Sequence, residues 1–290
     1  MGKNKNIFLK NKGLVVLGLG ILLGLAFILY PFFSQLFYDH GARSEVTDFQ
    51  ETVKAIDPPE LKEENVRLAE AYNEALEPNL RWIDPYSEEE REEGVEIYAE
   101  MLKVKEKIGV VHIPKINISL PLYAGTSESI LQKGIGHLEG TSLPVGGKNT
   151  HSVVTAHRGL PEARLFTDLD KMELGDIFSV ETVAGELFYK VDEIVVVEPH
   201  ETDRVKIIEE KDYLTLLTCT PYMINSHRLL VRGIRTNPPA VEELEEIKKQ
   251  QEKDLSYYLR TYWHYLLIIL ITLTSVIGIL SWQSRKEKNK

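Results

Sequence analysis

Three side chains in separate segments of the sequence have the types that acyl transfer through a thioester requires. The only cysteine, Cys219, lies in the run Thr-Leu-Leu-Thr-Cys-Thr-Pro, while His157 lies in Thr-Ala-His-Arg-Gly and Arg228 opens Arg-Leu-Leu-Val-Arg. A thiol with an ordinary pKa of about 8.5 is mostly protonated at neutral pH, and a neighbouring imidazole or guanidinium favours the nucleophilic thiolate. Histidine can also protonate a leaving amine, and arginine can stabilise an oxyanion.

Each of these residues taken alone also has an ordinary structural interpretation. A single cysteine on an apolar strand is commonly a small buried hydrophobic residue. Alternation along a strand puts Arg228 and Arg232 on one face and His227 on the other, so it does not choose between the two arginines. The pattern therefore leaves Arg232 as an alternative to Arg228, and His227 as a weaker candidate for a second base.

The three residues lie at the ends of short β-rich runs that are separated by turn residues. Pro221 follows the cysteine closely and Gly159 follows the histidine, and both residue types interrupt strands. A further short strand is expected near 134–138, and seven or eight strands at this spacing predict a closed barrel or a sandwich. The other expected strands are 108–113, 118–122, 152–156, 177–183, 187–197, 213–219 and 228–234.

Charged segments on both sides of the β-rich region favour helices. Within residues 39–107, apolar side chains recur at roughly helical spacing around 60–77, and 88–107 is a second candidate helix. Between them, Asp84-Pro85-Tyr86 breaks the pattern, because proline cannot continue a helix. Residues 236–256 are again charged and are expected to form a solvated helical stalk.

Two apolar stretches are long enough to cross a bilayer core of about 30 Å as helices. Neither 13–38 nor 262–283 contains Lys, Arg, Asp or Glu, and basic residues flank the outer end of each. Positive flanks stay in the cytoplasm, so we expect a plasma-membrane protein with both termini inside and residues 39–261 outside the cell. The first stretch could instead be a cleaved signal peptide, but it exceeds the usual length of about 7–15 apolar residues.

The exported part is acidic, because the whole chain has a formal net charge of −10 and its two tails are basic. This composition argues against binding nucleic acid, which requires neutralisation of phosphates. We find no Gly-rich phosphate loop and no metal-ligand spacing, and therefore expect no cofactor and no metal. His112, His137 and His151 are interpreted as turn or surface residues.

Together the motifs resemble those of the sortases, a family of cysteine transpeptidases. The run from Thr215 to Arg232 resembles their T-L-x-T-C strand followed by a strand with an arginine, and Thr-Ala-His157 resembles their histidine motif. By this resemblance the catalytic residues are Cys219, His157 and Arg228. Asp84-Pro85-Tyr86 resembles the lid of the class C sortases, which assemble pili.

The resemblance implies a mainly β fold, with a closed sortase-type barrel of seven or eight strands, peripheral helices and a transmembrane helix near each terminus. The implied parts are a cytoplasmic tail at 1–12, a span at 13–38, a helical region with the lid at 39–107, the catalytic barrel at 108–235, a stalk at 236–261, a span at 262–283 and a tail at 284–290.

The resemblance also implies a reaction. The enzyme would cut an LPxTG-like sorting signal of a pilin between Thr and Gly, hold the acyl group on Cys219 and pass it to a lysine of another pilin. Alternatives are a sortase that anchors proteins to the peptidoglycan precursor, a cysteine protease, and a non-catalytic membrane scaffold for pilins. For the lid we expect Asp84 to pair with Arg228 and Tyr86 to cover Cys219; a surface turn before a helix is the alternative.

Overall fold

The structure is a computed structural model, and it describes residues 12–76, 84–86, 96–240, 262–265, 267–275, 277–278 and 281. The chain divides into two compact units. One consists of Tyr38–Glu252, and the other combines Met1–Phe37 with Lys253–Lys290.

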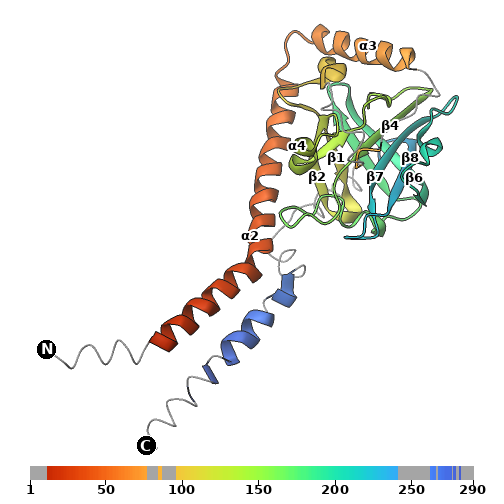
Figure 1. The fold of residues 1–290 in the computed structure, drawn as a ribbon. Helices are drawn as coiled ribbons and strands as arrows, with labels where there is room; N and C mark the ends of the chain where they lie inside the picture. The colour runs from red at the N-terminus through yellow and green to blue at the C-terminus, as the bar shows by residue number, and fades with distance from the viewer. Residues whose placement is uncertain are drawn as a thin grey trace, which may run out of the picture. The chain divides into compact units, whose positions relative to one another are not determined.

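A closed barrel of eight strands forms the centre of the larger unit. Figure 1 shows the strands packed together in this unit. The order around the barrel is β1-β2-β3-β4-β7-β8-β6-β5, and β5 pairs with β1 to close it. The β2–β3 and β4–β7 pairs are parallel and the others are antiparallel. The strands are β1 Lys107–Ile113, β2 Ile118–Ala124, β3 Ile135–His137, β4 Thr150–Thr155, β5 Ile177–Thr182, β6 Gly185–Val197, β7 Asp212–Thr220 and β8 His227–Thr236. The prediction of a closed, mainly β barrel is confirmed.

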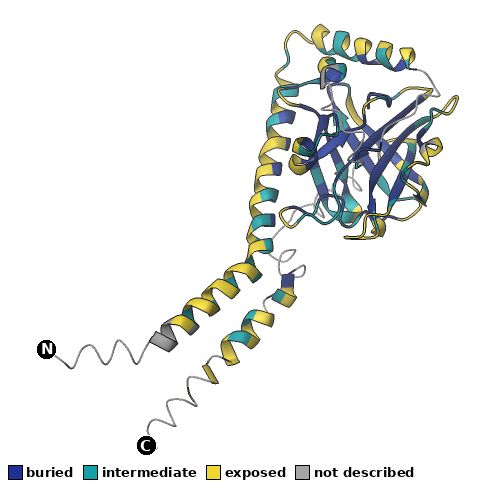
Figure 2. Ribbon diagram, viewed as in Figure 1, coloured by how far each residue is buried: buried dark blue, intermediate teal, exposed yellow. Residues whose placement is uncertain are grey.

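Strand β7 is buried on both faces, which explains its nearly continuous apolar sequence. Leu214 and Leu216 belong to the main hydrophobic core, whereas Leu217 belongs to a smaller cluster with Leu138, Val153, Val197, Val205 and Leu230. Figure 2 shows the barrel strands mostly in the colour of buried residues. Because side chains alternate along a strand, Cys219 lies on the same face as Leu217, over the smaller cluster.

Helical elements pack on the barrel, and of the first helix only the part after Phe37 belongs to the same unit. The longer helices are α2 Lys12–Lys54 and α3 Glu60–Ala75; the short elements are α4 Glu128–Lys133 and the 3₁₀ turns η1 Glu96–Leu102, η2 Pro114–Ile116, η3 Leu169–Lys171 and η4 Thr202–Val205. The predicted helix at 88–107 is wrong in its described part, which is the turn η1 followed by the start of β1. A tight turn at Lys105, where φ is 59°, separates the two elements. Of the predicted stalk, 241–261 lies outside the described residues.

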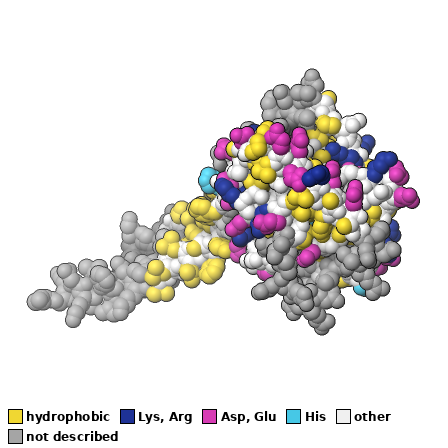
Figure 3. Space-filling view, turned by 90° about the horizontal axis from the view of Figure 1, so that it is seen from above, with side chains coloured by type: hydrophobic (Ala, Val, Ile, Leu, Met, Phe, Trp, Pro, Cys, Tyr) yellow, Lys and Arg dark blue, Asp and Glu magenta, His cyan; other side chains and the backbone are white. Residues whose placement is uncertain are grey.

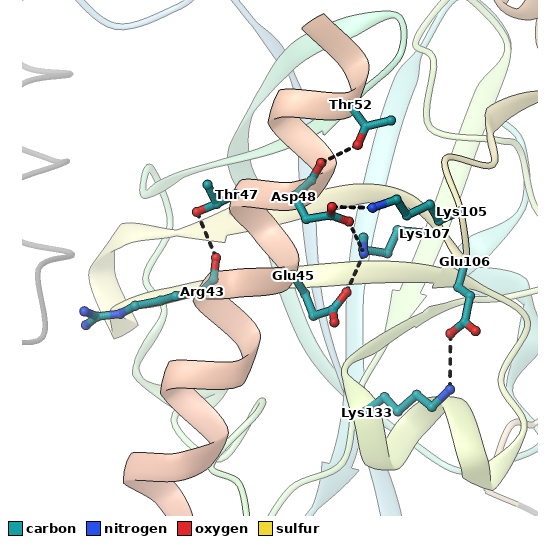
Figure 4. Close-up of polar contacts among 9 residues, drawn as sticks. All are labelled: Arg43, Glu45, Thr47, Asp48, Thr52, Lys105, Glu106, Lys107 and Lys133. Atoms are coloured by element: carbon teal, nitrogen blue, oxygen red, sulfur yellow. Dashed lines mark hydrogen bonds and ion pairs between the residues drawn. The ribbon is translucent and has the colours of Figure 1, made fainter. Parts of the chain in front are cut away.

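Helix α2 continues well beyond the predicted apolar span 13–38 and ends at Lys54. In its later part, Phe49 is fully buried in the main core. Glu45 and Asp48 contact the Lys107 amine, which is only 3% exposed, and Asp48 also contacts Lys105 (Figure 4). These ion pairs hold the later part of α2 against the barrel.

The acidic composition is spread over the surface of the molecule. Figure 3 shows Asp and Glu side chains scattered over the visible face among basic and hydrophobic ones. Several form exposed ion pairs, such as Lys148 with Glu210 and Arg204 with Glu193. Exposed pairs of this kind contribute about 0–1 kcal/mol each, so the acidic surface bears more on solubility and partners than on stability.

One described helix is long and apolar enough to cross a membrane, the stretch Gly18–Lys54 within α2. Length and apolar character alone also fit a signal sequence. At the other end, the described residues within Tyr262–Ser275 form a shorter apolar helix. The described residues therefore do not support the predicted second span at 262–283.

Helix α3 is tied to the barrel by a buried asparagine. Asn73 donates from its side-chain amide to the Leu143 carbonyl at 3.0 Å, and its amide oxygen accepts from the Leu143 N–H at 2.7 Å. Both bonds are buried, so neither backbone group of Leu143 has water as a substitute partner. An unpaired buried polar group costs about 1–3 kcal/mol.

We therefore expect Asn73→Ala to lower the free energy of unfolding by about 1–3 kcal/mol, since it leaves the buried Leu143 N–H without its partner, whereas the Leu143 carbonyl still accepts from the Val145 N–H at 2.8 Å. Glu74→Ala, at the exposed neighbouring position of the same helix, is the matched control, with an expected change within about 0.5 kcal/mol. Equilibrium denaturation measures both. Equal midpoints for the two variants would contradict the role of Asn73.

Candidate active site

The parallel pairing of β4 with β7 brings His157 level with Cys219. The ladder runs from Thr150 opposite Asp212 to Thr155 opposite Leu217 without a register shift. Contacts with the same separation of 62 residues continue beyond it: Thr218 Oγ1 donates to the Ala156 carbonyl at 2.8 Å, and Arg158 Nη1 donates to Thr220 Oγ1 at 2.8 Å. Since these two contacts bracket the pair, His157 lies beside Cys219 at the ends of adjacent strands.

The antiparallel pairing of β7 with β8 places Arg228 directly opposite Cys219. Side chains at directly opposed positions share a face, with Cβ atoms about 4.5–5.5 Å apart. Both side chains are buried, and each residue is only 5% exposed. The structure thus brings the thiol and this guanidinium together.

Arg232, the alternative arginine, is engaged elsewhere. It lies opposite Thr215, further from the end of β7 that carries the cysteine. Its Nε and Nη2 donate to the Asp192 carboxylate at 3.0 and 2.8 Å, and its Nη1 pairs with Glu193 at 2.9 Å. The register of β7 and β8 therefore distinguishes two arginines that alternation leaves equivalent.

His227, the candidate second base, lies opposite Thr220. It hydrogen-bonds through Nδ1 to the Ser226 hydroxyl at 2.8 Å, and its Nε2 is 3.8 Å from a Glu198 carboxylate oxygen. Its side chain is 41% exposed. Its described contacts are thus with neighbouring surface residues.

Asp84 forms a buried, two-pronged ion pair with Arg228. Arg228 donates from Nε to Oδ1 at 2.8 Å and from Nη2 to Oδ2 at 2.6 Å. The remaining terminal nitrogen, Nη1, donates to the backbone carbonyls of Asn225 and His227. The guanidinium is therefore occupied by protein acceptors on all sides, and Asp84, which is 8% exposed, takes its carboxylate-binding edge.

Tyr86 lies among the three candidate catalytic residues. Its ring centroid is 5.6 Å from that of His157 and 5.2 Å from the Arg228 guanidinium carbon, and its charge interaction with Cys219 is one cause of its raised pKa. Its hydroxyl donates to the Ala156 carbonyl at 2.7 Å and contacts Thr155 Oγ1. Pro85, between Asp84 and Tyr86, is buried. Asp84, Pro85 and Tyr86 thus lie against the three candidate catalytic residues.

The electrostatics of this closed arrangement favour the thiol over the thiolate. Burial raises the pKa of Cys219 to about 11; Arg228 acts to lower it, and the Asp84 carboxylate adds to the rise. Burial is also the main reason why the pKa of Tyr86 is well above its ordinary value, so this hydroxyl stays protonated. With Asp84 in place, Cys219 is a weak nucleophile at neutral pH.

Two residues near His157 make contacts that are not predictable from the sequence patterns. Glu128, the first residue of α4, places Oε1 3.2 Å from His157 Nε2. Arg158, next to the histidine, is bound to Thr220, the Thr167 carbonyl and Asp170. Arg158 thus joins the ends of the strands that carry the histidine and the cysteine.

The interpretation of three other histidines as turn or surface residues is wrong for two of them. His137 and His151 are 0% and 1% exposed. Burial lowers the pKa of each to about 4, so both are neutral, and both hydrogen-bond to backbone carbonyls, those of Ser142 and Lys206. His112 is partly buried near Glu181. In the described ranges, no group of three or more His, Cys, Asp or Glu side chains is arranged to hold a metal ion.

Comparisons with known proteins agree with this geometry. Residues 111–236 match the Sortase domain family. The solved structure of sortase C-1 from Streptococcus pneumoniae is 48% identical, with a TM-score of 0.65, and the match covers 68% of this chain and 100% of that chain. Group B Streptococcus Pilus Island 1 sortase C2 is 59% identical, with a TM-score of 0.59, and the match covers 63% and 100%.

Among curated relatives, sortase D of Bacillus subtilis (strain 168) is 32% identical over 114 residues, which are 39% of this chain and 54% of that protein. Sortase A of Bacillus anthracis is 28% identical over 134 residues, 46% and 61% of the two chains. The chain spans little more than half the length of these curated relatives.

The ion pair with Arg228 predicts a pH-dependent thiol reactivity. Alkylation of Cys219 by iodoacetamide requires the thiolate, so its rate should rise with pH toward about 11 in the unmodified protein. Asp84→Ala removes a carboxylate that raises the thiol pKa and frees Arg228, which lowers it. We expect the midpoint to move to lower pH and the rate at pH 7.5 to rise about tenfold or more, as a drop of one pKa unit gives a factor of ten.

Tyr86→Ala should also speed labelling, by uncovering the sulfur. Asp192→Ala is the matched control and should leave labelling unchanged. Asp192 accepts two hydrogen bonds from Arg232, as Asp84 does from Arg228, and both arginines lie on β8. Labelling of Asp84→Ala and Tyr86→Ala at the parental rate would refute the role of the lid.

Proposed function

This chain belongs to the sortase family, and we propose that it is a cysteine transpeptidase that joins pilin subunits. Its substrate is a pilin with an LPxTG-like sorting signal, which it cuts between Thr and Gly. The acceptor is the side-chain amine of a lysine on another pilin, so that the product is a polymer linked by isopeptide bonds. The observation that carries this proposal is the position of Cys219 between His157, just past the end of the adjacent strand β4, and Arg228 on the other adjacent strand.

In the first half of the reaction, the Cys219 thiolate attacks the threonine carbonyl carbon. Arg228 stabilises the charge that develops on the carbonyl oxygen, as a buried guanidinium can. The C–N bond then breaks, His157 gives its proton to the departing glycine amine, and a thioester to Cys219 is left.

The second half reverses these roles. The lysine amine attacks the thioester carbonyl and His157 takes a proton from it. The C–S bond breaks, the new amide forms, and Cys219 returns to the thiolate. Water competes with the amine for the thioester, so a shielded site favours transfer over hydrolysis. The buried face on which Cys219 and Arg228 lie supports such shielding.

The lid must leave before either half can proceed. Asp84 takes the edge of Arg228 that a substrate carbonyl would need, and Tyr86 lies among the reacting groups. Departure of Asp84 also removes one cause of the high thiol pKa. We therefore propose that Asp84, Pro85 and Tyr86 form a lid that keeps the free enzyme inactive by occupying Arg228 and by holding Cys219 as a thiol.

The membrane supplies the setting in this proposal. The apolar stretch within α2 supports an N-terminal anchor, and the lysines before it favour a cytoplasmic N-terminus with the barrel outside the cell. The second span at 262–283, with a cytoplasmic C-terminus, stays a prediction. An enzyme and a substrate held at the same bilayer face meet at a raised effective concentration without additional contacts.

Incubation of the full chain with a pilin that carries the sorting signal tests this proposal. We expect a ladder of covalent pilin oligomers that disappears with Cys219→Ala. His157→Ala should slow its formation by about 10²–10⁴-fold and Arg228→Ala by about 10²–10³-fold. Arg232→Ala, on the same face of the same strand, should stay within about threefold of the parent.

The nature of the product decides between the proposal and its rivals. Mass spectrometry should find a bond between the signal's threonine and a pilin lysine. Free cleaved pilin alone would indicate a protease, and unchanged pilin would indicate a scaffold; either result would refute pilin polymerisation by this chain.

A further inference from the structure

The carboxylate of Glu128 lies at the edge of the His157 ring. Its Oε1 is 3.2 Å from Nε2, at hydrogen-bonding distance. Within the described part of the chain, Glu128 is the only side chain that hydrogen-bonds to this imidazole. Tyr86 packs against the ring through its own ring but belongs to the lid segment, whereas Glu128 belongs to α4. The contact of Glu128 with His157 therefore does not involve the lid segment.

The chemistry of this contact fixes where the proton of a neutral His157 lies. An ionised carboxylate can only accept hydrogen bonds, so the ring nitrogen that faces it must carry a proton. In a neutral imidazole the other nitrogen, Nδ1, is then the free base. A histidine that must exchange protons with two successive amines needs the same nitrogen free in each cycle.

Helix α4 is held in place by its packing. At its first turn, the exposed Gln132 side-chain amide also donates to Glu128 Oε1 at 3.1 Å, a contact within the helix itself. At its last residue, Tyr38 on α2 donates from its hydroxyl to the Lys133 carbonyl at 2.9 Å. Ile130 and Leu131, in the middle of α4, are buried. The short helix is thus packed, and the carboxylate has a defined position at the edge of the ring.

From this geometry we propose that Glu128 is a positioning residue for His157. It keeps the imidazole in the tautomer with the proton on Nε2, so that Nδ1 is the atom that exchanges protons with the leaving and the incoming amine. The imidazolium gives up its Nδ1 proton and returns to the same tautomer. This inference rests on the proposed transpeptidase function, and it assigns a task to a residue outside the three catalytic side chains.

Nitrogen NMR on the full chain in detergent, labelled with ¹⁵N-histidine, tests the tautomer directly. The His157 signals are identified by their loss in His157→Gln. We expect the parent to show a protonated Nε2 and an unprotonated Nδ1. Glu128→Gln should show a mixture of tautomers, because an amide can donate as well as accept. Gln132→Ala, which removes the other partner of the same oxygen, is the matched control and should keep the parental pattern.

Kinetics supply the second readout, with a peptide that carries the sorting signal as donor and an amine as acceptor. Glu128→Gln should lower kcat about tenfold and leave KM within twofold, because Glu128 acts on proton exchange and does not bind the substrate. The loss is smaller than for a buried carboxylate beside a catalytic histidine, about 10⁴-fold, since the Glu128 side chain is 43% exposed. Gln132→Ala should stay within twofold in both parameters.

The outcomes separate this inference from the proposed function. A parental tautomer pattern in Glu128→Gln, or kcat equal to that of Gln132→Ala, would overturn the role of Glu128. If the parent enzyme shows no turnover that depends on Cys219, the proposed function fails, while the NMR result still decides whether Glu128 sets the tautomer. Should Glu128→Gln unfold at a lower temperature than the parent, Glu128→Ala replaces it, with the same expected mixture and loss of kcat.

Discussion

The site depends on the position of β7 between a parallel neighbour, β4, and an antiparallel neighbour, β8. A one-residue slip in either pairing would turn the partner side chain to the opposite face of the sheet. The β7–β8 register runs without a shift to the end of β7, with Cys219 opposite Arg228. The β4–β7 register runs to Thr155 opposite Leu217, and contacts at the same offset continue beyond it and bring His157 level with Cys219. Arg158 reinforces this arrangement. It follows His157 directly in the sequence, and its side chain donates to Thr220 at the end of β7.

The same pairing lets Arg228 interact both with the Cys219 thiol and with the Asp84 carboxylate of the lid. A buried guanidinium requires acceptors, and breaking a buried ion pair by removing one partner is strongly unfavourable. In the closed state Asp84 meets this requirement. Asp84 can therefore leave Arg228 only if carbonyl groups of the substrate accept its hydrogen bonds instead. In the proposed mechanism this exchange ties opening of the lid to the arrival of a substrate. The resting thiol is weakly acidic mainly because it is buried, and the Asp84 carboxylate adds to this effect.

Much of this fold could be predicted from the sequence, because the strands carry local signals. Alternating apolar residues and turn residues placed all eight strands, even β3, which has only three residues. The meeting of His157 and Cys219 is different. It depends on a parallel pairing between distant segments, and residue types suggest such a meeting but do not give the register. For the same reason, Arg228 could be preferred to Arg232 only through the family resemblance.

The predictions that failed or fell short concern charged and polar groups whose partners are distant in sequence. Glu45 and Asp48 carry no sequence pattern that indicates a partner, but Lys107 on β1 binds both. His137 and His151 carry no pattern that reveals their burial, since backbone carbonyls are among their partners. Glu128 lies on a six-residue helix with no motif of its own. Tertiary packing alone brings such groups to their partners.

The central claim is that Arg228 exchanges the Asp84 carboxylate for a carbonyl oxygen of the substrate. A crystal structure with a sorting-signal peptide analogue attached to the Cys219 sulfur would test this claim most directly. The account predicts that Arg228 then donates to the carbonyl oxygen next to the sulfur, with Asp84 and Tyr86 withdrawn and His157 still beside the sulfur. A structure in which the attached peptide coexists with an intact Asp84–Arg228 pair would contradict it.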